Sequence, residues 1–410
     1  MGLFSQNSGR ITEGWVFDAK APLVAGCAVA DRNGQPHVIV GTTKGTIICL
    51  DQQGHEVWTY HAEEQFTEVE SFFVDEERVH GIDAPPLVAD INNDGKHEIL
   101  FGTEAGILYC VSMDGKLIWK EDCKGTIRAS PEVADINSDG HPEILVGAGN
   151  KLVVVQYTGH TLFEYIGDAP VESVPCVVKA GKTIIVFGNN NGQLTAITPS
   201  QELVWQRELR DKITAAPVAF KANEEQRVIV GTLGGIVVCV SEHGEPVWDF
   251  KTEGSVYSKV AIGDINDDKQ SEVVISSCDN NVYALTLDGE RVWSYQTDFW
   301  ITSTPIIADL DNDHHLEVVV GSYDHNIYVL DGQGTYVLDY VPGLSGIVHQ
   351  AGHYASTLTS DPGEQTGKRL YKYRVENMVV GCSLLENHGK PTLVVSTKEG
   401  HVHTLTHEQQ

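Results

Sequence analysis

Short apolar tracts alternate with Gly-rich and Asp-rich turns along the whole chain. A representative unit contains an apolar tract at 84–90, a second tract at 98–102, an alternating tract at 106–111 and a fourth tract centred on Trp119. Apolar residues that recur with a period of two indicate half-buried β-strands, and short Gly or Asp-Gly turns indicate antiparallel pairing. The pattern therefore predicts units of four short antiparallel strands.

The four-strand unit recurs at a nearly constant interval. Its fourth strand is marked by Trp58, Trp119, Phe163, Trp205, Trp248, Trp293 and Leu338, and most successive markers are 42–45 residues apart. Four strands in such an interval are typical of one blade of a β-propeller. Trp15 lies 43 residues before Trp58 and marks a lone strand, whereas the last unit of the chain supplies only three strands.

We therefore predict an all-β fold, a single eight-bladed β-propeller over residues 1–410 with four antiparallel strands in each blade. The strand at 11–20 is expected to complete the last blade, at about 375–408, and so to close the ring. Two inserts, at about 61–82 and 342–374, exceed the repeat. We expect both to join the outer strand of one blade to the inner strand of the next, on one face beside blades 8 and 1.

Four units carry the same acidic turn between their first and second strands. The turn places oxygen-bearing side chains at positions 1, 3, 5 and 9, which are the chemistry that a hard cation prefers. These residues are Asp90, Asn92, Asp94 and Glu98; Asp135, Asn137, Asp139 and Glu143; Asp264, Asn266, Asp268 and Glu272; and Asp309, Asp311, Asp313 and Glu317. We predict up to four Ca²⁺ ions; the alternative is an Asx-type hairpin turn that needs no metal.

The acidic turn, followed by an apolar strand and Gly, resembles the FG-GAP repeats of integrin-α-like calcium-binding propellers. The Asp-Gly-x-x-x-Trp ends of the units, as at 114–119, resemble the repeats of PQQ-like propellers. The resemblance implies a propeller fold and calcium binding. It implies little about activity, because this fold hosts lectins, adhesion modules, scaffolds, lyases and dehydrogenases.

The composition narrows the range of partners. The chain has 28 Lys and Arg against 57 Asp and Glu, a net charge of −29, which argues against binding nucleic acid or an anionic membrane. No apolar run is long enough for a membrane span. The eight cysteines contain no C-x-x-C pair, and no signal peptide is evident, so we expect a cytoplasmic protein, or a secreted one if a signal was removed.

Candidate functional residues lie before the inner strands and in the second insert. Arg128 and Trp300 precede inner strands and are expected near the channel mouth, where an aromatic ring could stack on a sugar or instead belong to the core. The other candidate ligand-binding residues are His353, Tyr371 and Lys372, and the candidate catalytic residues are His349, Tyr354 and Arg374. Propeller polysaccharide lyases use His or Tyr for proton transfer with a basic residue beside a uronate, but the insert could equally be packed by its aromatics.

These observations lead to two functional hypotheses. The first is a non-enzymatic, calcium-stabilised propeller that binds or scaffolds a protein or glycan ligand on the face carrying the inserts. The alternative is a carbohydrate-active enzyme, a polysaccharide lyase that acts on an acidic glycan. Because the first insert is acidic and the second ends in basic residues, we expect the two inserts to fold together over the ligand site.

Overall fold

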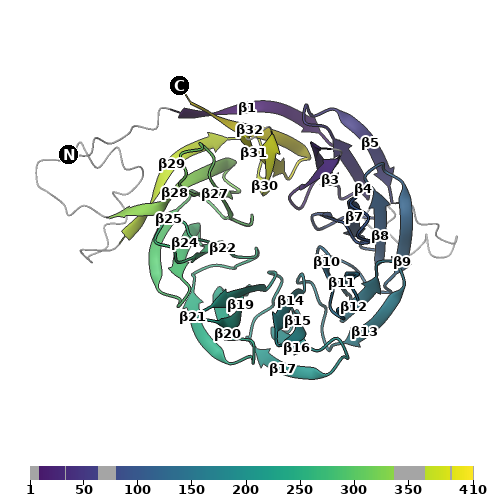
Figure 1. Ribbon diagram of the computed structural model, residues 1–410. Helices are drawn as coiled ribbons and strands as arrows, with labels where there is room; N and C mark the ends of the chain where they lie inside the picture. The colour runs from purple at the N-terminus through teal and green to yellow at the C-terminus, as the bar shows by residue number, and fades with distance from the viewer. Residues whose placement is uncertain (1–8, 33, 63–79, 337–364, 388–389, 410) are drawn as a thin grey trace, which may run out of the picture.

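The strands form a closed ring of eight blades around a central channel (Figure 1). The computed structural model describes all residues except 1–8, 33, 63–79, 337–364, 388–389 and 410. The described residues form 32 strands and no helix, so none of them belongs to a helix that could cross a membrane. The predicted eight-bladed, all-β propeller is confirmed.

Each blade is an antiparallel meander of four strands, ordered from the channel outwards. Blade 1 contains β2 (Ala28–Arg32), β3 (Gln35–Gly41), β4 (Thr46–Leu50) and β5 (Glu56–His61); blade 2 contains β6 (Leu87–Ala89), β7 (Glu98–Gly102), β8 (Ile107–Ser112) and β9 (Leu117–Asp122). Blade 3 contains β10 (Glu132–Ala134), β11 (Glu143–Ala148), β12 (Lys151–Gln156) and β13 (Thr161–Ile166); blade 4 contains β14 (Cys176–Ala180), β15 (Lys182–Gly188), β16 (Gln193–Ile197) and β17 (Leu203–Glu208).

The second half of the ring repeats this order. Blade 5 contains β18 (Val218–Ala222), β19 (Glu225–Gly231), β20 (Ile236–Ser241) and β21 (Pro246–Lys251); blade 6 contains β22 (Ala261–Gly263), β23 (Glu272–Ser276), β24 (Asn281–Thr286) and β25 (Arg291–Gln296). Blade 7 contains β26 (Ile306–Ala308), β27 (Glu317–Gly321), β28 (Asn326–Tyr336) and β29 (Gln365–Arg374). Blade 8 contains β30 (Val379–Asn387), β31 (Lys390–Thr397) and β32 (His401–Gln409).

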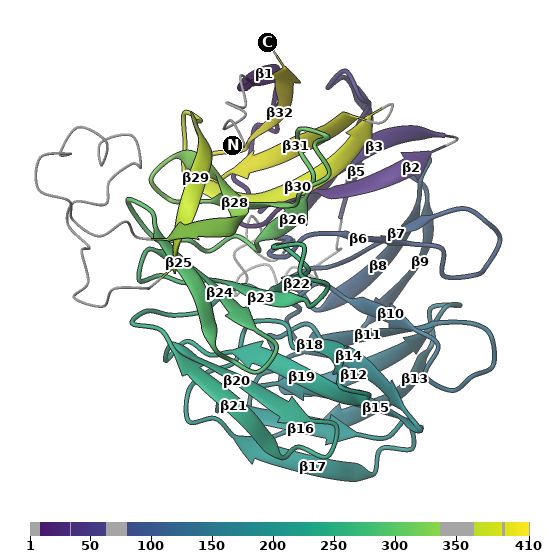
Figure 2. The same cartoon turned by 60° about the vertical axis from the view of Figure 1, so that its left-hand side comes forward.

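The strand β1 (Gly9–Asp18) closes the ring as the outer strand of blade 8. It pairs antiparallel with β32 from Gly9 opposite Gln409 to Asp18 opposite His401, and the two strands run side by side in Figures 1 and 2. The edge of β32 is therefore covered, as the sequence predicted.

The core consists of apolar layers between neighbouring blades. Leu100 and Leu108 of blade 2, for example, pack in one cluster with Ile144 and Val153 of blade 3, and all four are fully buried. Burial of each such side chain contributes roughly 1.5–3 kcal/mol to folding. Adjacent blades are therefore joined by continuous hydrophobic layers.

Indole rings dock most blades onto the next one. Each of six indole N–H groups donates to a backbone carbonyl of the following blade: Trp15 to Gln52, Trp58 to Met113, Trp119 to Tyr157, Trp205 to Glu242, Trp248 to Leu287 and Trp293 to Gly332, at 2.8–2.9 Å. The third-to-fourth-strand turns make room for the rings, because a Cβ at Gly115 would lie 2.7 Å from the Trp58 ring. The recurrent Trp thus fixes the blade-to-blade spacing.

The outer strand of blade 7 corrects the predicted second insert. Residues from Lys368 to Arg374, which the sequence placed in that insert, pair with β28, and Tyr371 lies opposite Val329 in the register that Trp119 has opposite Cys110. The Tyr371 hydroxyl and His407 Nε2 of blade 8 are hydrogen-bonded at 3.0 Å. The additional residues interrupt the third-to-fourth-strand hairpin of blade 7, so counting 45 residues from Trp293 led to Leu338, which lies outside the described residues.

Antiparallel pairing gives the ring two different faces. The first-to-second and third-to-fourth-strand hairpins lie on what we call the hairpin face, and the second-to-third-strand loops and blade-to-blade linkers lie on the linker face. Residues 63–79 fall within a linker, whereas 337–364 fall within a third-to-fourth-strand hairpin. The prediction that both inserts leave from one face is therefore wrong, because the flanking strands place their starts on opposite faces. The prediction that they cover a common sector falls on residues outside the described ones.

Candidate functional site

The four acidic turns lie on the hairpin face and share one hydrogen-bonding scheme. The Glu at position 9 accepts from the backbone N–H of position 2: Glu98 from Ile91, Glu143 from Ile136, Glu272 from Ile265 and Glu317 from Leu310, at 2.8–3.1 Å. The position 1 carboxylate accepts from the amide of position 6, as in the 2.8 Å bond between Asp90 and Gly95. These bonds hold the oxygen-bearing side chains around the inside of each turn.

The backbone of all four turns is the same even where the sequence differs. Position 4 is left-handed at Asn93, Ser138, Asp267 and Asn312, with φ of 59–63°. Position 6 is also left-handed, both at Gly95 and Gly140 and at Lys269 and His314, where φ is 71° and 73°. The side-chain scheme therefore holds the left-handed conformation without glycine.

The position 9 glutamates are almost fully buried, and burial raises their pKa. The pKa of Glu272 is raised to about 7 and that of Glu317 to about 8, by burial first and by the neighbouring aspartates second. In blade 6, Asn266 Nδ2 stabilises the carboxylate of Glu272, because it donates to Glu272 Oε1 at 3.0 Å. Asn137 makes the same hydrogen bond to Glu143 in blade 3. Position 3 thus offers an amide donor in these turns.

The turn of blade 7 differs because Asp311 stands at position 3. Oxygens of Asp309, Asp311 and Glu317 lie within 4.8 Å of one another, the one such group of three potential metal ligands among the described residues. Asp311 is 5% exposed, and burial followed by the charge of Asp313 raises its pKa. The donor set is all oxygen and compact, which fits a hard cation such as Ca²⁺.

Neighbouring acidic turns also contact each other. Asn93 Nδ2 donates to the backbone oxygen of Gly140, linking the turns of blades 2 and 3 at 2.6 Å. His315 Nδ1 lies 2.5 Å from Asp267 Oδ2, linking the turns of blades 7 and 6. The four turns therefore form two pairs on the hairpin face, and each pair is joined by one side-chain contact between neighbouring blades.

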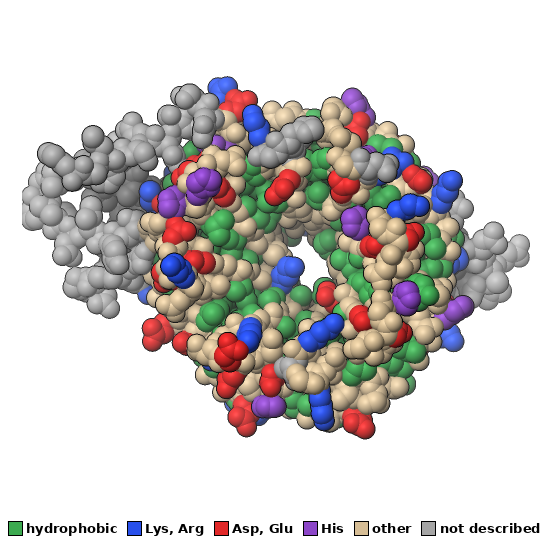
Figure 3. Space-filling view, in the orientation of Figure 1, with side chains coloured by type: hydrophobic (Ala, Val, Ile, Leu, Met, Phe, Trp, Pro, Cys, Tyr) green, Lys and Arg blue, Asp and Glu red, His purple; other side chains and the backbone are tan. Residues whose placement is uncertain are grey.

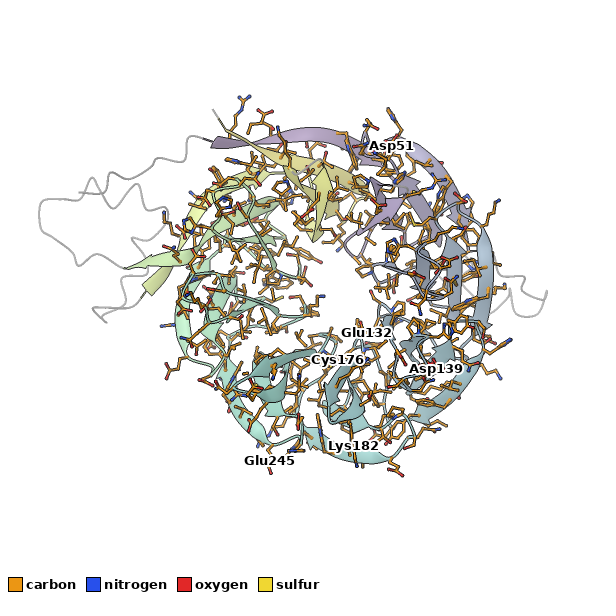
Figure 4. The ribbon with its side chains drawn as sticks, viewed as in Figure 1. Asp51, Glu132, Asp139, Cys176, Lys182 and Glu245 are labelled. Carbon is orange, nitrogen blue, oxygen red and sulfur yellow. The ribbon has the colours of Figure 1, made fainter. Side chains whose placement is uncertain are left out.

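A cavity of about 690 Å³ occupies the opposite end of the channel, on the linker face. We call it the mouth. Its lining residues are Val24, Thr43, Gly81, Asp83, Glu104, Arg128, Glu172, Thr214, Tyr257, Trp300, Thr302, Tyr323 and Val380. The space-filling view shows that the centre of the ring is open (Figure 3), and Figure 4 places Glu132 and Cys176 near this centre and Asp139 and Glu245 towards the periphery.

Every blade contributes one residue to the mouth from an equivalent position, which lies in the linker before the inner strand in blades 1 to 7 and is the second residue of β30 in blade 8. This residue directly follows a buried aliphatic side chain: Leu23, Ile82, Ile127, Val171, Ile213, Val256, Ile301 or Val379. Most of these aliphatics are pinned through their amides, as when Ile127 donates to the Thr103 carbonyl at 3.2 Å. The eight presented residues are Val24, Asp83, Arg128, Glu172, Thr214, Tyr257, Thr302 and Val380.

Exposed aromatic side chains stand on one side of the mouth. Trp300 and Phe299 are 48% and 43% exposed, and their rings stack with centroids 5.1 Å apart at 13°. Their backbone is held in place, because the Ser322 hydroxyl lies 3.1 Å and 3.2 Å from their two carbonyl oxygens and shares its one proton between them, and the Tyr323 amide donates to the carbonyl of Trp300. Tyr257 adds a third ring that is 46% exposed. We call the three lining aromatics, Tyr257, Trp300 and Tyr323, the aromatic arc; Phe299 stacks on Trp300 and is not itself part of the lining.

Paired charges stand on the other side. Arg128 contacts Glu104 and Glu172 at 3.2 Å each, and Lys212 contacts Glu172 at 2.6 Å, so alternating charges connect four successive blades. The pKa of Glu172 is lowered, although its burial acts in the opposite direction, because Lys212, Asn190 and Arg128 favour the carboxylate. We call this network the charged arc.

The structure brings together only part of the predicted ligand set. Arg128 and Trp300 line one mouth, as expected. Lys372 instead contacts Asp298 at 2.6 Å and the Tyr328 ring at 5.0 Å, and Tyr371 docks onto blade 8. Arg374 ends β29, the outer strand, and is exposed away from the mouth lining. His349, His353 and Tyr354 lie outside the described residues.

Sequence reasoning missed most of the mouth. Tyr257, Glu172 and Asp83 were not selected, although each directly follows an aliphatic residue near the end of a linker. Alignment of the linkers on that aliphatic residue would have found them. Glu104 and Tyr323 come from second-to-third-strand loops, which carry no comparable marker in the sequence.

The chain is an eight-bladed β-propeller whose mouth carries aromatic side chains on one side and paired charges on the other. Residues 112–208 and 227–341, slightly more than half of the chain, match the family described as the lambda-carrageenase beta-propeller domain. The chain belongs to this family of propeller domains. The FG-GAP assignment is not shown by this match, and no curated protein matches the sequence.

Solved structures that resemble this chain confirm the fold. BamB from Moraxella catarrhalis is 14% identical, with a TM-score of 0.64 over 97% of this chain and 100% of that chain. BBS1N, solved in complex with ARL6DN, is 13% identical, with a TM-score of 0.52 over 78% of this chain and 90% of that chain. Identity at this level supports the fold alone.

Proposed function

We propose that this chain is a non-enzymatic, calcium-stabilised propeller that binds a glycan at the mouth. The observation that carries the proposal is the pair of stacked, exposed rings of Phe299 and Trp300 on a pinned backbone. Large aromatic surfaces are normally buried, so fixed exposure at a cavity favours a ligand that covers them. The flat, apolar face of a pyranose ring is such a ligand. The family match supports a carbohydrate context.

Calcium forms the second part of the proposal. Asp309, Asp311 and Glu317 would hold one ion in blade 7, where their oxygens already converge. The turns of blades 2, 3 and 6 would hold further ions with the same positions, once the position 3 Asn presents its oxygen inwards. The ions would neutralise clustered carboxylates and brace the hairpin face, away from the mouth.

The binding proposal can be tested with a panel of soluble neutral, sulfated and uronate-rich polysaccharides in affinity electrophoresis. We expect at least one polysaccharide to retard the wild-type protein, and Trp300→Ala to lose at least tenfold in affinity. Ile166→Ala serves as the matched control, because Ile166 is 70% exposed on β13, an outer strand. Retardation by no polysaccharide, or equal retardation of both variants, would contradict the proposal.

A carbohydrate-active enzyme is the second candidate, and the name of the matched family favours it. Of the residues selected for that role, Arg374 is at the periphery and His349 and Tyr354 lie outside the described residues. Incubation of the retarding polysaccharide with wild-type protein, followed by size analysis and a reducing-end assay, distinguishes the two. An unchanged chain length supports binding without cleavage, and shortening that a His349→Ala variant abolishes would establish the enzyme.

A further inference from the structure

We infer that the mouth selects an uncharged saccharide segment and discriminates against sulfated or uronate-bearing ones. This inference rests on the proposed function and specifies the class of glycan. The supporting observation is that charged and aromatic side chains lie on different sides of the mouth. The glycan class inferred here, an uncharged one, differs from the acidic glycan that the sequence suggested.

The charge of the mouth is unfavourable for an anionic ligand. Three lining carboxylates, Asp83, Glu104 and Glu172, face a single lining guanidinium, that of Arg128. This guanidinium is already bound by two of the three carboxylates, and Lys212 is bound by Glu172. A sulfate approaching Arg128 would have to displace a paired carboxylate or share the cation with it, against the field of a chain with a net charge of −29.

The same pairs suit hydroxyl groups. Held by one another, the planar carboxylates and the half-exposed guanidinium keep fixed orientations, and each retains unused lone pairs or N–H groups. A sugar hydroxyl both donates and accepts, so it can bond to a carboxylate oxygen and a guanidinium N–H without bringing net charge. Paired charges thus act here as oriented hydrogen-bonding groups.

The residues that line the remaining side of the mouth are uncharged, and a cation beside them is Lys398, whose Nζ lies 6.0 Å from the centroid of the Tyr323 ring. Among the eight equivalent positions, the residues from blade 5 to blade 1 carry no charge: Thr214, Tyr257, Thr302, Val380 and Val24. Trp300 and Tyr323 belong to this side. A saccharide that lays one ring face on Trp300 can direct its hydroxyls across the same cavity towards the charged arc. The geometry therefore matches both surfaces of an uncharged sugar.

The test compares two matched pairs of oligosaccharides by isothermal titration with the full-length protein in calcium. One pair is λ-carrageenan oligosaccharides before and after desulfation, and the other is polygalacturonate and its methyl ester. We expect the uncharged member of at least one pair to bind at least tenfold more tightly than its charged partner. Trp300→Ala should abolish this binding, Trp300→Phe should retain most of it, and Ile166→Ala should leave it unchanged.

Charge-neutralising variants provide a second measurement. The double variant Glu104→Gln, Glu172→Gln frees Arg128 from its carboxylates, so it should weaken binding of the uncharged oligosaccharide and improve binding of the charged one severalfold. Tighter Trp300-dependent binding of a charged member by the wild-type protein would overturn the inference and leave the proposed function standing. Binding of neither pair would also overturn the inference, and binding of no polysaccharide in the panel as well would overturn the proposed function itself.

Discussion

The two faces of this ring are built from the same blades but use repetition in opposite ways. On the hairpin face, four turns keep one backbone and one hydrogen-bonding scheme, even where Lys269 and His314 replace glycine. At the mouth, eight equivalent positions each follow a buried aliphatic residue but hold six different residue types. The residues that repeat from blade to blade therefore hold the framework, and the residues that vary within a fixed position line the mouth where we propose that a ligand binds.

The two faces also differ in whether their characteristic side chains interact with the protein itself or remain exposed to solvent. In the acidic turns, buried carboxylates bond to amides of their own turn, so their interactions serve the fold. At the mouth, Trp300 and Phe299 are exposed on a rigid support. Changes on the hairpin face should therefore cost stability, and changes at the mouth should cost binding.

The largest expected effect comes from removing the closure on which both faces depend. Deletion of residues 1–18 removes β1 and exposes the edge of β32, so we expect aggregation or loss of the cooperative melting transition. Deletion of residues 1–8 alone is the control and should melt like the full chain. Size-exclusion chromatography and calorimetry make the comparison; a monomeric 1–18 deletion with unchanged melting would refute the role of β1.

A second change tests the hairpin face alone. Glu143→Ala leaves the Ile136 N–H and the Asn137 amide without their acceptor, so the free energy of unfolding should fall by about 2–3 kcal/mol. Glu245→Ala, an exposed position on the same face, should change it by about 0.5 kcal/mol or less. Denaturant titration measures both. Loss of glycan binding by folded Glu143→Ala would show that the two faces are not separable.

Exchange of position 3 between blades tests the calcium proposal. Asp311→Asn introduces the amide that Asn137 provides in blade 3, so it should reduce the rise in melting temperature that calcium causes. The reverse change, Asn137→Asp, removes a donor from Glu143 and should lower melting in a chelator while enlarging the calcium-dependent rise. Melting of the wild-type protein that is the same in chelator and calcium, with no metal by elemental analysis, would contradict the proposal.

The smallest expected effect concerns the channel between the faces. Glu132 on β10 is half-buried, and burial raises its pKa above the usual 4.5, although Lys259 opposes this shift. Because the folded-state pKa is the higher one, the ionised carboxylate costs stability at neutral pH, and protonation restores it as the pH falls through that pKa. Glu132→Gln should therefore stabilise by less than about 1 kcal/mol at pH 7, with no such gain near pH 4. Thermal melts at both pH values measure this difference.

The sequence predicted the fold because the physical constraints of a blade recur. Trp119 and its equivalents must reach the next blade, and the turn that receives each ring must leave room for it, as Gly159 does for Trp119, so the spacing of these residues reveals the units. The predicted position of the outer strand was wrong in blade 7. There Tyr371 takes the position that Trp has in other blades, and the hairpin before it is longer. A repeat defined by one residue type cannot locate a strand that uses another.

The site was less predictable for a different reason. Arg128 and Trp300 were recognised from their position before inner strands, and both line the mouth. Tyr257 and Glu172 were not recognised, because a residue that varies from blade to blade leaves no pattern. The pairing of Arg128 with two carboxylates depends on linkers and loops of three different blades. Only the folded ring shows that this cation is already occupied.

Closure by β1 has a consequence for the order in which the chain folds. Gly9 finds its partner at Gln409, so the first strand pairs only with the last one, and this contact spans nearly the whole sequence. Contacts of such separation form slowly, because a long loop must be closed first. During synthesis, blades 1 to 7 can assemble in turn, whereas β1 has no strand partner until β32 has been made. Completion of blade 8 is then the committing step, and the incomplete ring is the species most exposed to aggregation and to strand exchange between chains.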